Sequence, residues 1–223
     1  MNANTIVVTG ANGAVSTALI KYFSNHFKHT IGISRNPSKQ DLGDNTHFLK
    51  ADISAPKEAE NAINEIHDSY GNISCVINCA GGFDMGQTIE DSHYQWDQMH
   101  LINFSTCLNT SKAAISAMKK TGGGCIINFG SKAALDGFAN AAPYLVSKCA
   151  VHALTKFISI EGEEQNIRCN AILPGIIDTQ ANRDAMPAED FSKWESTQDI
   201  AKMAHRIIDS SVTGELITLD QDI

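Results

Sequence analysis

Three residues whose types and spacing suit proton transfer lie in one short stretch of the sequence. Tyr144 and Lys148 stand four residues apart, and Ser131 precedes the tyrosine by thirteen residues. On a helix, positions i and i+4 share a face, with Cβ atoms roughly 5–6 Å apart. An ammonium group beside a phenol stabilises the phenolate, so we expect Lys148 to lower the pKa of Tyr144 from its usual value of about 10. With a serine hydroxyl holding the carbonyl oxygen, such a site could interconvert a carbonyl and an alcohol.

A turn with two glycines near the start of the chain could bind the source of the hydride. The apolar run Thr5–Thr9 stops at Gly10, and Gly13 comes just before a helical pattern that starts at Ala14. Glycines here let backbone N–H groups approach a pyrophosphate, and the dipole of the following helix favours its negative charge. The turn reads Gly10-x-x-Gly13-x-x-Ser16 and lacks the full G-x-G-x-x-G pattern, so an ordinary strand–helix turn remains an open interpretation.

Composition and charge are those of an ordinary folded protein. The chain has 223 residues, 43% of them hydrophobic and 19% charged, which is enough to bury a sizeable core. The net charge of −8 disfavours nucleic acid or an anionic membrane as the main partner. The six cysteines show neither C-x-x-C spacing nor ligand spacing with histidines, so we expect reduced thiols and no metal site. Without a signal-peptide pattern or a membrane-spanning apolar run, the sequence predicts a cytoplasmic protein.

Short apolar runs alternate with helical patterns along the whole chain. The sequence predicts strands at Thr5–Thr9, Thr30–Ser34, His47–Ala51, Ser74–Asn78, Cys125–Phe129, Ile167–Leu173 and Glu215–Leu219. It predicts helices at Ala14–Phe27, from Pro56 to Tyr70 with Ser54 as cap, at Ile89–Lys120 in two pieces, at Pro143–Gly162, and from the Ser196-x-x-Asp199 capping box to Asp209. Strict β-α alternation over residues 1–223 predicts a single α/β domain, a doubly wound, Rossmann-like parallel sheet with helices on both faces.

Polar residues and glycines gather where the predicted strands end. In doubly wound sheets, ligands bind beyond the carboxyl ends of the strands. The residues at those ends are Gly10, Arg35, Asp52, Asn78, Ser131 and Pro174. Because the carboxyl ends of parallel strands meet at one edge of the sheet, we expect these residues to share one site.

In their order along the chain, these signals resemble the short-chain dehydrogenase/reductase family from Thr5 to Asp220. The series is the turn after Thr9, Asp52-Ile53, Asn78-Cys79-Ala80-Gly81, Asn103, Ser131, Tyr144-x-x-x-Lys148, and Pro174-Gly175 followed by Thr179. Taken singly, each motif has a plain structural explanation as an exposed helix pair, a turn, a mid-helix polar residue or a helix cap. Jointly, the motifs fit one set of catalytic roles.

The resemblance implies a role for each matching residue. Tyr144 would protonate the carbonyl oxygen, Lys148 would assist it and bind the nicotinamide ribose, and Ser131 would hold the substrate oxygen. Asn103 would hold a water in the proton relay. Cofactor contacts are expected from Gly10, Asn12, Gly13, Ala14, Val15, Arg35, Asp52, Ile53, Asn78, Ala80, Gly81, Tyr144, Lys148, Pro174, Gly175 and Thr179.

The tip of the second predicted strand bears on the choice of cofactor. An acid there would hydrogen-bond the ribose 2′-hydroxyl and repel a 2′-phosphate. The chain instead has Arg35, whose guanidinium offers a fork to that phosphate. We therefore expect NADP(H) in preference to NAD(H), with a solvated loop arginine as the alternative.

Within the family, the segments Gly130–Gly137, Val151-His152 and Leu173–Trp194 resemble dihydropteridine reductases, which reduce quinonoid dihydropterins and favour NADH. Those enzymes generally lack the serine and asparagine that this chain has at Ser131 and Asn103. A complete set of four suits ordinary carbonyl reduction. His152 itself is expected to be a packed or interface residue.

Apolar residues are expected to line the substrate side of the site. The loop from Ile176 to Trp194 should cover the substrate and includes Met186, and Phe83 and Met85 should face it. Such a pocket would suit a flat ring or a small hydrophobic ketone, although ordinary packing under a surface loop explains these residues as well.

The sequence thus predicts an NADPH-dependent reductase of a carbonyl or imine. A quinonoid dihydropterin reductase is the alternative within the same class, and a dinucleotide-binding sensor or scaffold is the alternative outside catalysis. The resemblance also implies a homodimer or homotetramer formed through the helices near 91–120 and 143–162.

Overall fold

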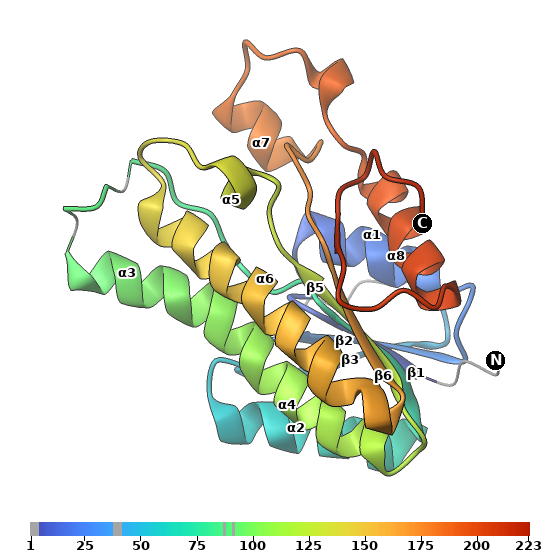
Figure 1. The fold of residues 1–223 in the computed structure, drawn as a ribbon. Coiled ribbons are helices and arrows are strands. Elements are labelled where there is room, and N and C mark those ends of the chain that lie inside the picture. Colours follow the sequence, from blue (N-terminus) through green and yellow to red (C-terminus); the bar gives the residue numbers. More distant parts are fainter. Residues whose placement is uncertain (1–4, 38–41, 87, 91) are drawn as a thin grey trace.

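The computed structural model describes residues 5–37, 42–86, 88–90 and 92–223, whose strands form one parallel sheet (Figure 1). Its order is β3-β2-β1-β4-β5-β6-β7. The strands are β1 (Thr5–Thr9), β2 (His29–Ser34), β3 (Thr46–Lys50), β4 (Ile73–Asn78), β5 (Gly124–Phe129), β6 (Ile167–Ile172) and β7 (Leu216–Ile217). The order reverses direction between β1 and β4, as in a doubly wound sheet, so the predicted fold class is confirmed.

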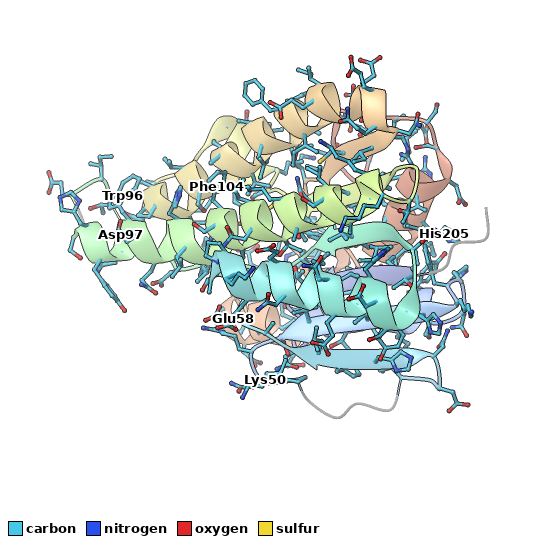
Figure 2. All side chains as sticks on the ribbon, turned by 90° about the horizontal axis from the view of Figure 1, so that it is seen from below. Lys50, Glu58, Trp96, Asp97, Phe104 and His205 are labelled. Atoms are coloured by element: carbon cyan, nitrogen blue, oxygen red, sulfur yellow. The ribbon has the colours of Figure 1, made fainter. Side chains whose placement is uncertain are left out.

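Helices cover both faces of this sheet. They are α1 (Ala14–Phe23), α2 (Pro56–Tyr70), α3 (His93–Met99), α4 (Thr106–Lys119), α5 (Ala133–Asp136), α6 (Ala142–Gly162), α7 (Gln180–Ala185) and α8 (Thr197–Asp209). Figure 1 shows α1 and α8 together on one face, and Figure 2 shows α2, α4 and α6 side by side on the other. The segment with α7 and the 3-10 turn Phe191–Lys193 stands above the sheet.

The core follows from parallel strands that are buried on both faces. Along β1, Ile6 and Val8 pack with the apolar residues of α1 and α8, whereas Val7 packs with those of α2 and α4. This alternation puts Ile6, Val7 and Val8 in hydrophobic layers, which is why the middle of the strand is continuously apolar.

Most predicted strands and helices lie within one or two residues of the observed ones, but α1 ends earlier than predicted. It stops at Phe23 rather than at Phe27. The Asn45 side-chain amide donates to the carbonyls of Ser24 (2.7 Å) and Phe27 (2.8 Å). These contacts hold residues 24–27 in a turn beneath the sheet edge, so the helix does not continue.

Two other predicted boundaries were wrong. Ala55, not Ser54, is the N-cap residue of α2, because the Ser54 hydroxyl donates instead to Asp52 Oδ1 (2.7 Å). The last strand is only Leu216–Ile217 rather than Glu215–Leu219, and it lies at the edge of the sheet with β6 as its sole neighbour.

The long helical stretch predicted over 89–120 consists of α3 and α4 joined through a π-helical segment, His100–Ser105. Position 91 lies outside the described residues, and α3 begins at His93. The part of α3 with Trp96 and Asp97 projects beyond the sheet (Figure 2). A π segment widens one turn of a helix, and such segments are frequent at functional sites. In the described part of the chain, no helix is both long and apolar enough to cross a membrane.

Candidate active site

Tyr144, Lys148 and Ser131 come together where β5 meets α6. Tyr144 and Lys148 lie one turn apart near the start of α6, with Lys148 Nζ 5.9 Å from the centre of the Tyr144 ring. Ser131 follows β5, and its hydroxyl lies close enough to the Tyr144 phenol to lower the phenol's pKa by hydrogen bonding. Lys148 is buried, and its ammonium donates to the carbonyl of Phe129 at the end of β5 (2.8 Å). The structure therefore places a phenol, a hydroxyl and an ammonium group within one small volume.

The proton affinity of Tyr144 differs from the expectation. Burial raises the pKa of Tyr144, and the hydrogen bond from Ser131 offsets only part of that rise. Burial also lowers the pKa of Lys148, since the ammonium loses its water. The pKa of Tyr144 is thus shifted upward and not downward as predicted, because desolvation outweighs the hydrogen bond from Ser131. A phenol that keeps its proton at neutral pH can donate it to a carbonyl oxygen.

Asn103 fixes the loop that follows β4. It lies in the π segment with its side chain buried, and its Nδ2 donates to the Gly82 carbonyl while the Gly82 N–H donates to its Oδ1 (both 3.0 Å). A Cβ on Gly81 would lie 2.6 Å from the same Oδ1, so only glycine permits this approach. That position is also 3.6 Å from Lys148 Nζ, which puts Asn103 beside the catalytic candidates.

His152 lies one turn beyond Lys148 on α6 and is packed, as expected. Its side chain is buried against β5, and the Ser131 N–H donates to its Nε2 (3.2 Å). Burial, followed by the charge of Lys148, lowers the pKa of His152 to about 4. The imidazole is therefore neutral and acts as a hydrogen-bond acceptor at neutral pH.

Two cavities meet at the carboxyl edge of the sheet. The first, ≈ 330 Å³, is lined by Gly10, Asn12, Ile33–Asn36, Ala51–Ser54, Ala80, Gly81, Gln98, Leu101, Ile102 and Thr106. The second, ≈ 490 Å³, is lined by Gly10, Gly13–Ser16, Cys79–Phe83, Phe129, Gly130, Tyr144, Lys148, Pro174, Gly175, Ile177 and Thr179–Ala181. They share Gly10, Ala80 and Gly81, so together they form one elongated groove that starts at the tip of β2 and ends at Tyr144.

The middle of this groove lies at the switch point between β1 and β4. Gly10 has a φ of +70°, and a Cβ there would lie 2.8 Å from the Ala80 Cα. Thr9 Oγ1 accepts hydrogen bonds from the N–H groups of Cys79 (3.1 Å) and Ala80 (3.0 Å), which holds the two loops together. Gly13 is the N-cap residue of α1 and brings no side chain to cover the N–H groups of the first turn. Those N–H groups can therefore bind an anion in the groove.

Most of the predicted cofactor residues line this groove, and Asn78 is the exception. Its side chain is buried behind the groove, where Nδ2 donates to Ser111 Oγ and Asn128 Oδ1 (both 2.9 Å). The structure therefore places the Asn78 side chain in the core, whereas the sequence predicted that it contacts a cofactor. Its neighbours Ala80 and Gly81 do line both cavities.

Of the four residues predicted to face the substrate, Phe83 lines the second cavity. Its ring meets the Tyr144 ring edge to face, with centroids 4.9 Å apart. The described lining does not include Met85, Met186 or Trp194. Met85 is 63% exposed, and Trp194 packs on Phe191 with ring centroids 4.7 Å apart. In the segment from Ile176 to Trp194, which we call the strap, the aromatic residues Phe191 and Trp194 thus pack on each other and do not line the second cavity.

The sequence did not reveal the partners of three residues that support the site. Thr9, which opens the glycine turn, joins the β1 and β4 loops, as described above. Asn109 donates to the carbonyls of Ile53 (3.1 Å) and Ser54 (3.0 Å) and so fixes the wall of the first cavity. Glu195 accepts from the Gly175 N–H (2.9 Å) at the base of the strap. Their partners lie far away in the sequence, so local spacing could not have revealed these roles.

The described residues contain no group of three or more His, Cys, Asp or Glu side chains that could hold a metal ion. At one end of the elongated groove, the geometry offers a cluster of side chains that can transfer a proton.

Comparison with known proteins identifies relatives of this chain. A family model described as short chain dehydrogenase matches residues 4–190. The chain is 30% identical over 192 residues to the short chain dehydrogenase prhI of Penicillium brasilianum (83% of this chain, 74% of that protein). It is 28% identical over 183 residues to a 3beta-hydroxysteroid dehydrogenase of Mediterraneibacter gnavus (78% of this chain, 66% of that protein). The structure of ElxO with NADP bound has the same fold, with a TM-score of 0.89 and 23% identity over 97% of both chains.

The two glycines of the first turn should respond differently to alanine. Gly10→Ala should lower the free energy of unfolding by about 2 kcal/mol or more, because it combines a positive φ with a clash against Ala80. Gly13→Ala should cost about 1 kcal/mol or less, since its φ is −73° and the nearest atom to the new Cβ is 3.4 Å away. Urea unfolding measures both, and equal losses would contradict the assigned geometry.

His152 should make stability depend on pH. With a folded pKa of about 4 against an ordinary value of 6.5, the unfolded chain binds the extra proton between these values. Stability should therefore fall as pH drops through this window, by on the order of 2 kcal/mol between pH 7 and pH 5. Urea unfolding at both pH values should show a smaller drop for His152→Gln, which does not titrate. An identical drop in the two proteins would refute the buried neutral state.

Proposed function

Because the chain belongs to the short-chain dehydrogenase/reductase family, we propose that it is an NADPH-dependent reductase of a carbonyl or imine. The observation that carries the proposal is the cluster of Tyr144, Ser131 and Lys148 at one end of the groove, in which Ser131 and Lys148 are buried and Tyr144 is partly buried. A sensor or scaffold would bind a dinucleotide without needing such a cluster.

The residues along the groove fit a dinucleotide. Gly10 leaves the space that a Cβ would fill, and the first turn of α1 offers N–H groups to a pyrophosphate. Ser34 Oγ is buried and has no hydrogen-bond partner among the described residues, so a polar ligand atom would satisfy it. When bound, the nicotinamide supplies hydride to the substrate carbon.

The protein's own part in the reaction is to hold the substrate oxygen and to protonate it. Tyr144 keeps its proton at neutral pH and gives it from Oη to that oxygen as negative charge develops there. The Ser131 hydroxyl donates a hydrogen bond to the same oxygen. Lys148, bound to the Phe129 carbonyl, provides a cation beside the phenol that stabilises the phenolate left behind.

The end of the groove at the tip of β2 supports NADPH over NADH. Ser34, Arg35 and Asn36 line it, and the strand tip has no carboxylate to repel a 2′-phosphate. The nearby Asp52 carboxylate accepts from the N–H and hydroxyl of Ser54 (3.0 and 2.7 Å). These bonds, and secondarily the charge of Arg35, hold the pKa of Asp52 low.

The mouth of the site supports a flat, apolar carbonyl compound as substrate. Phe83 and Phe138 are exposed there, with ring centroids 6.5 Å apart, and Phe83 also touches Tyr144. Aromatic rings in this position can stack on a ring-bearing substrate. A quinonoid dihydropterin is also flat and remains our second candidate, whereas the presence of both Ser131 and Asn103 favours an ordinary carbonyl.

We also propose a cytoplasmic homodimer or homotetramer. All six cysteines are free, which suits a reducing compartment. The outer side of α6 exposes Val146, Phe157 and Ile160, and α6 lies beside α4 in one layer (Figure 2). An apolar stripe of this kind on a surface helix fits burial against a second copy of the chain.

Tyr144→Phe should lower kcat by about 100-fold or more, because the variant lacks the proton that Tyr144 donates. The assay follows NADPH absorbance with aromatic ketones, aliphatic ketones and quinonoid dihydropterin. NADPH affinity, measured by fluorescence titration, should change by less than about threefold, since the ring remains in place. The control Tyr94→Phe alters an exposed tyrosine of α3 and should keep full activity.

A near wild-type rate for Tyr144→Phe would exclude Tyr144 as the acid. Tight binding of NADPH by the wild-type protein without turnover of any substrate would favour the sensor.

Arg35→Asp should reverse the preference between cofactors. It removes a charged hydrogen bond to the 2′-phosphate and adds repulsion, so the ratio of kcat/KM for NADPH over NADH should fall by at least about tenfold. Lys57→Asp makes the same charge change on α2, outside the groove lining, and should leave the ratio unchanged. If both variants keep the wild-type ratio, Arg35 has no part in cofactor choice.

Charges on the outer side of α6 should dissociate the oligomer. The double variant Phe157→Glu/Ile160→Glu buries two carboxylates in the proposed interface, which is costly without partners. Light scattering after gel filtration should report a monomer for this variant and an oligomer for the wild type. Ile176→Glu, on the strap, should keep the wild-type mass. An unchanged mass for the double variant would place the interface elsewhere.

A further inference from the structure

The backbone around Ser131 is held from two sides. The Gly130 N–H donates to the Ile172 carbonyl and the Lys132 N–H to the Pro174 carbonyl (both 2.9 Å), which binds the flanking residues to β6 and the loop after it. The Ser131 N–H donates to His152 Nε2 on α6 instead (3.2 Å). Because both groups are buried, this hydrogen bond is the link between the serine's own peptide unit and the helix.

The same helix carries the phenol that Ser131 must meet. Tyr144, Lys148 and His152 follow one another at intervals of four residues and share one face of α6. Lys148 is bound to the Phe129 carbonyl, and His152 to the Ser131 N–H. The helix thus binds the chain two residues before the serine and at the serine itself, so one rigid element sets the distance between the serine hydroxyl and the Tyr144 phenol.

Gly130 shows how close the imidazole lies to this segment. A Cβ on Gly130 would be 2.5 Å from His152 Nε2 and 2.7 Å from its Cδ2. The ring therefore packs directly on the backbone between β5 and Ser131, and the glycine is what makes room for it.

The direction of the hydrogen bond fixes the form of the imidazole. An N–H donor requires a lone pair on Nε2, so the ring is neutral with its proton on Nδ1. Its buried position beside the Lys148 ammonium disfavours a second positive charge, which agrees with the lowered pKa.

We propose that His152 is a positioning residue, whose imidazole holds the Ser131 backbone so that the serine hydroxyl faces the substrate oxygen. This rests on the proposed function, because the orientation of Ser131 affects turnover only if its hydroxyl holds that oxygen. His152 touches neither of the two cavities as a lining residue. It therefore acts through Ser131.

Two variants separate this role from mere packing. His152→Leu fills the space but has no acceptor, whereas His152→Gln places an amide oxygen three bonds from Cβ, as Nε2 is in histidine. In His152→Leu, kcat should fall by about tenfold or more, while the Kd for NADPH should stay within about threefold. His152→Gln should regain most of the lost kcat. A wild-type kcat in a folded His152→Leu protein, or a His152→Gln variant as slow as His152→Leu, would overturn the proposal.

A double variant tests whether His152 acts through Ser131. Once Ser131→Ala has removed the hydroxyl, adding His152→Leu should lower kcat by less than about twofold, since the two losses share one cause. If the two losses instead multiply, His152 acts by another route and the proposal fails.

Amide hydrogen exchange of Ser131, followed by NMR, does not depend on any substrate. Exchange should be at least about tenfold faster in His152→Leu than in the wild type, and close to the wild type in His152→Gln. Equal exchange in all three proteins would overturn the positioning contact. A wild-type protein that reduces no substrate but shows this exchange pattern would refute the proposed function while supporting the contact.

Discussion

The docking of α6 on the end of β5 through Lys148 is the constraint on which the site depends. An ammonium that is almost fully buried must be bound, since its desolvation is costly. The Phe129 carbonyl meets that need at 2.8 Å and lies at the carboxyl edge of the sheet. The helix is therefore fixed in both depth and rotation relative to the strand. Tyr144, one turn earlier on the same face, then comes to lie over the edge where the groove ends.

Burial affects the proton affinity of both side chains. Tyr144 is partly buried and Lys148 almost fully buried, which favours the neutral form of each. For the phenol, the neutral form is the proton donor, so it can give its proton to a nearby oxygen on which negative charge develops. The hydrogen bond from Ser131 moderates this effect and keeps the phenolate accessible as a product of the proton transfer.

The sequence predicted the sheet and the residues at its carboxyl edge because both follow from local patterns. Gly10, Ala80 and Tyr144 could be found from strand ends and from spacing along a helix. Burial and distant partners could not be found in this way. The pKa of Tyr144 was predicted in the wrong direction because the extent of its burial depends on the whole fold. Asn78 was assigned to the cofactor because its position after a strand could be found locally, whereas its partners could not. Those partners, Ser111 and Asn128, come from other elements and hold the Asn78 side chain in the core.

The two cavities have three lining residues in common, Gly10, Ala80 and Gly81, whose side chains are a single methyl group or a hydrogen atom. Their smallness is what makes two chambers continuous. A bulkier side chain at any of these three positions would separate the two cavities, and each cavity would then accept only one part of a two-part ligand. Because the two cavities are continuous, a ligand with two parts could occupy both at once; each part would raise the local concentration of the other, so neither would need to bind tightly alone.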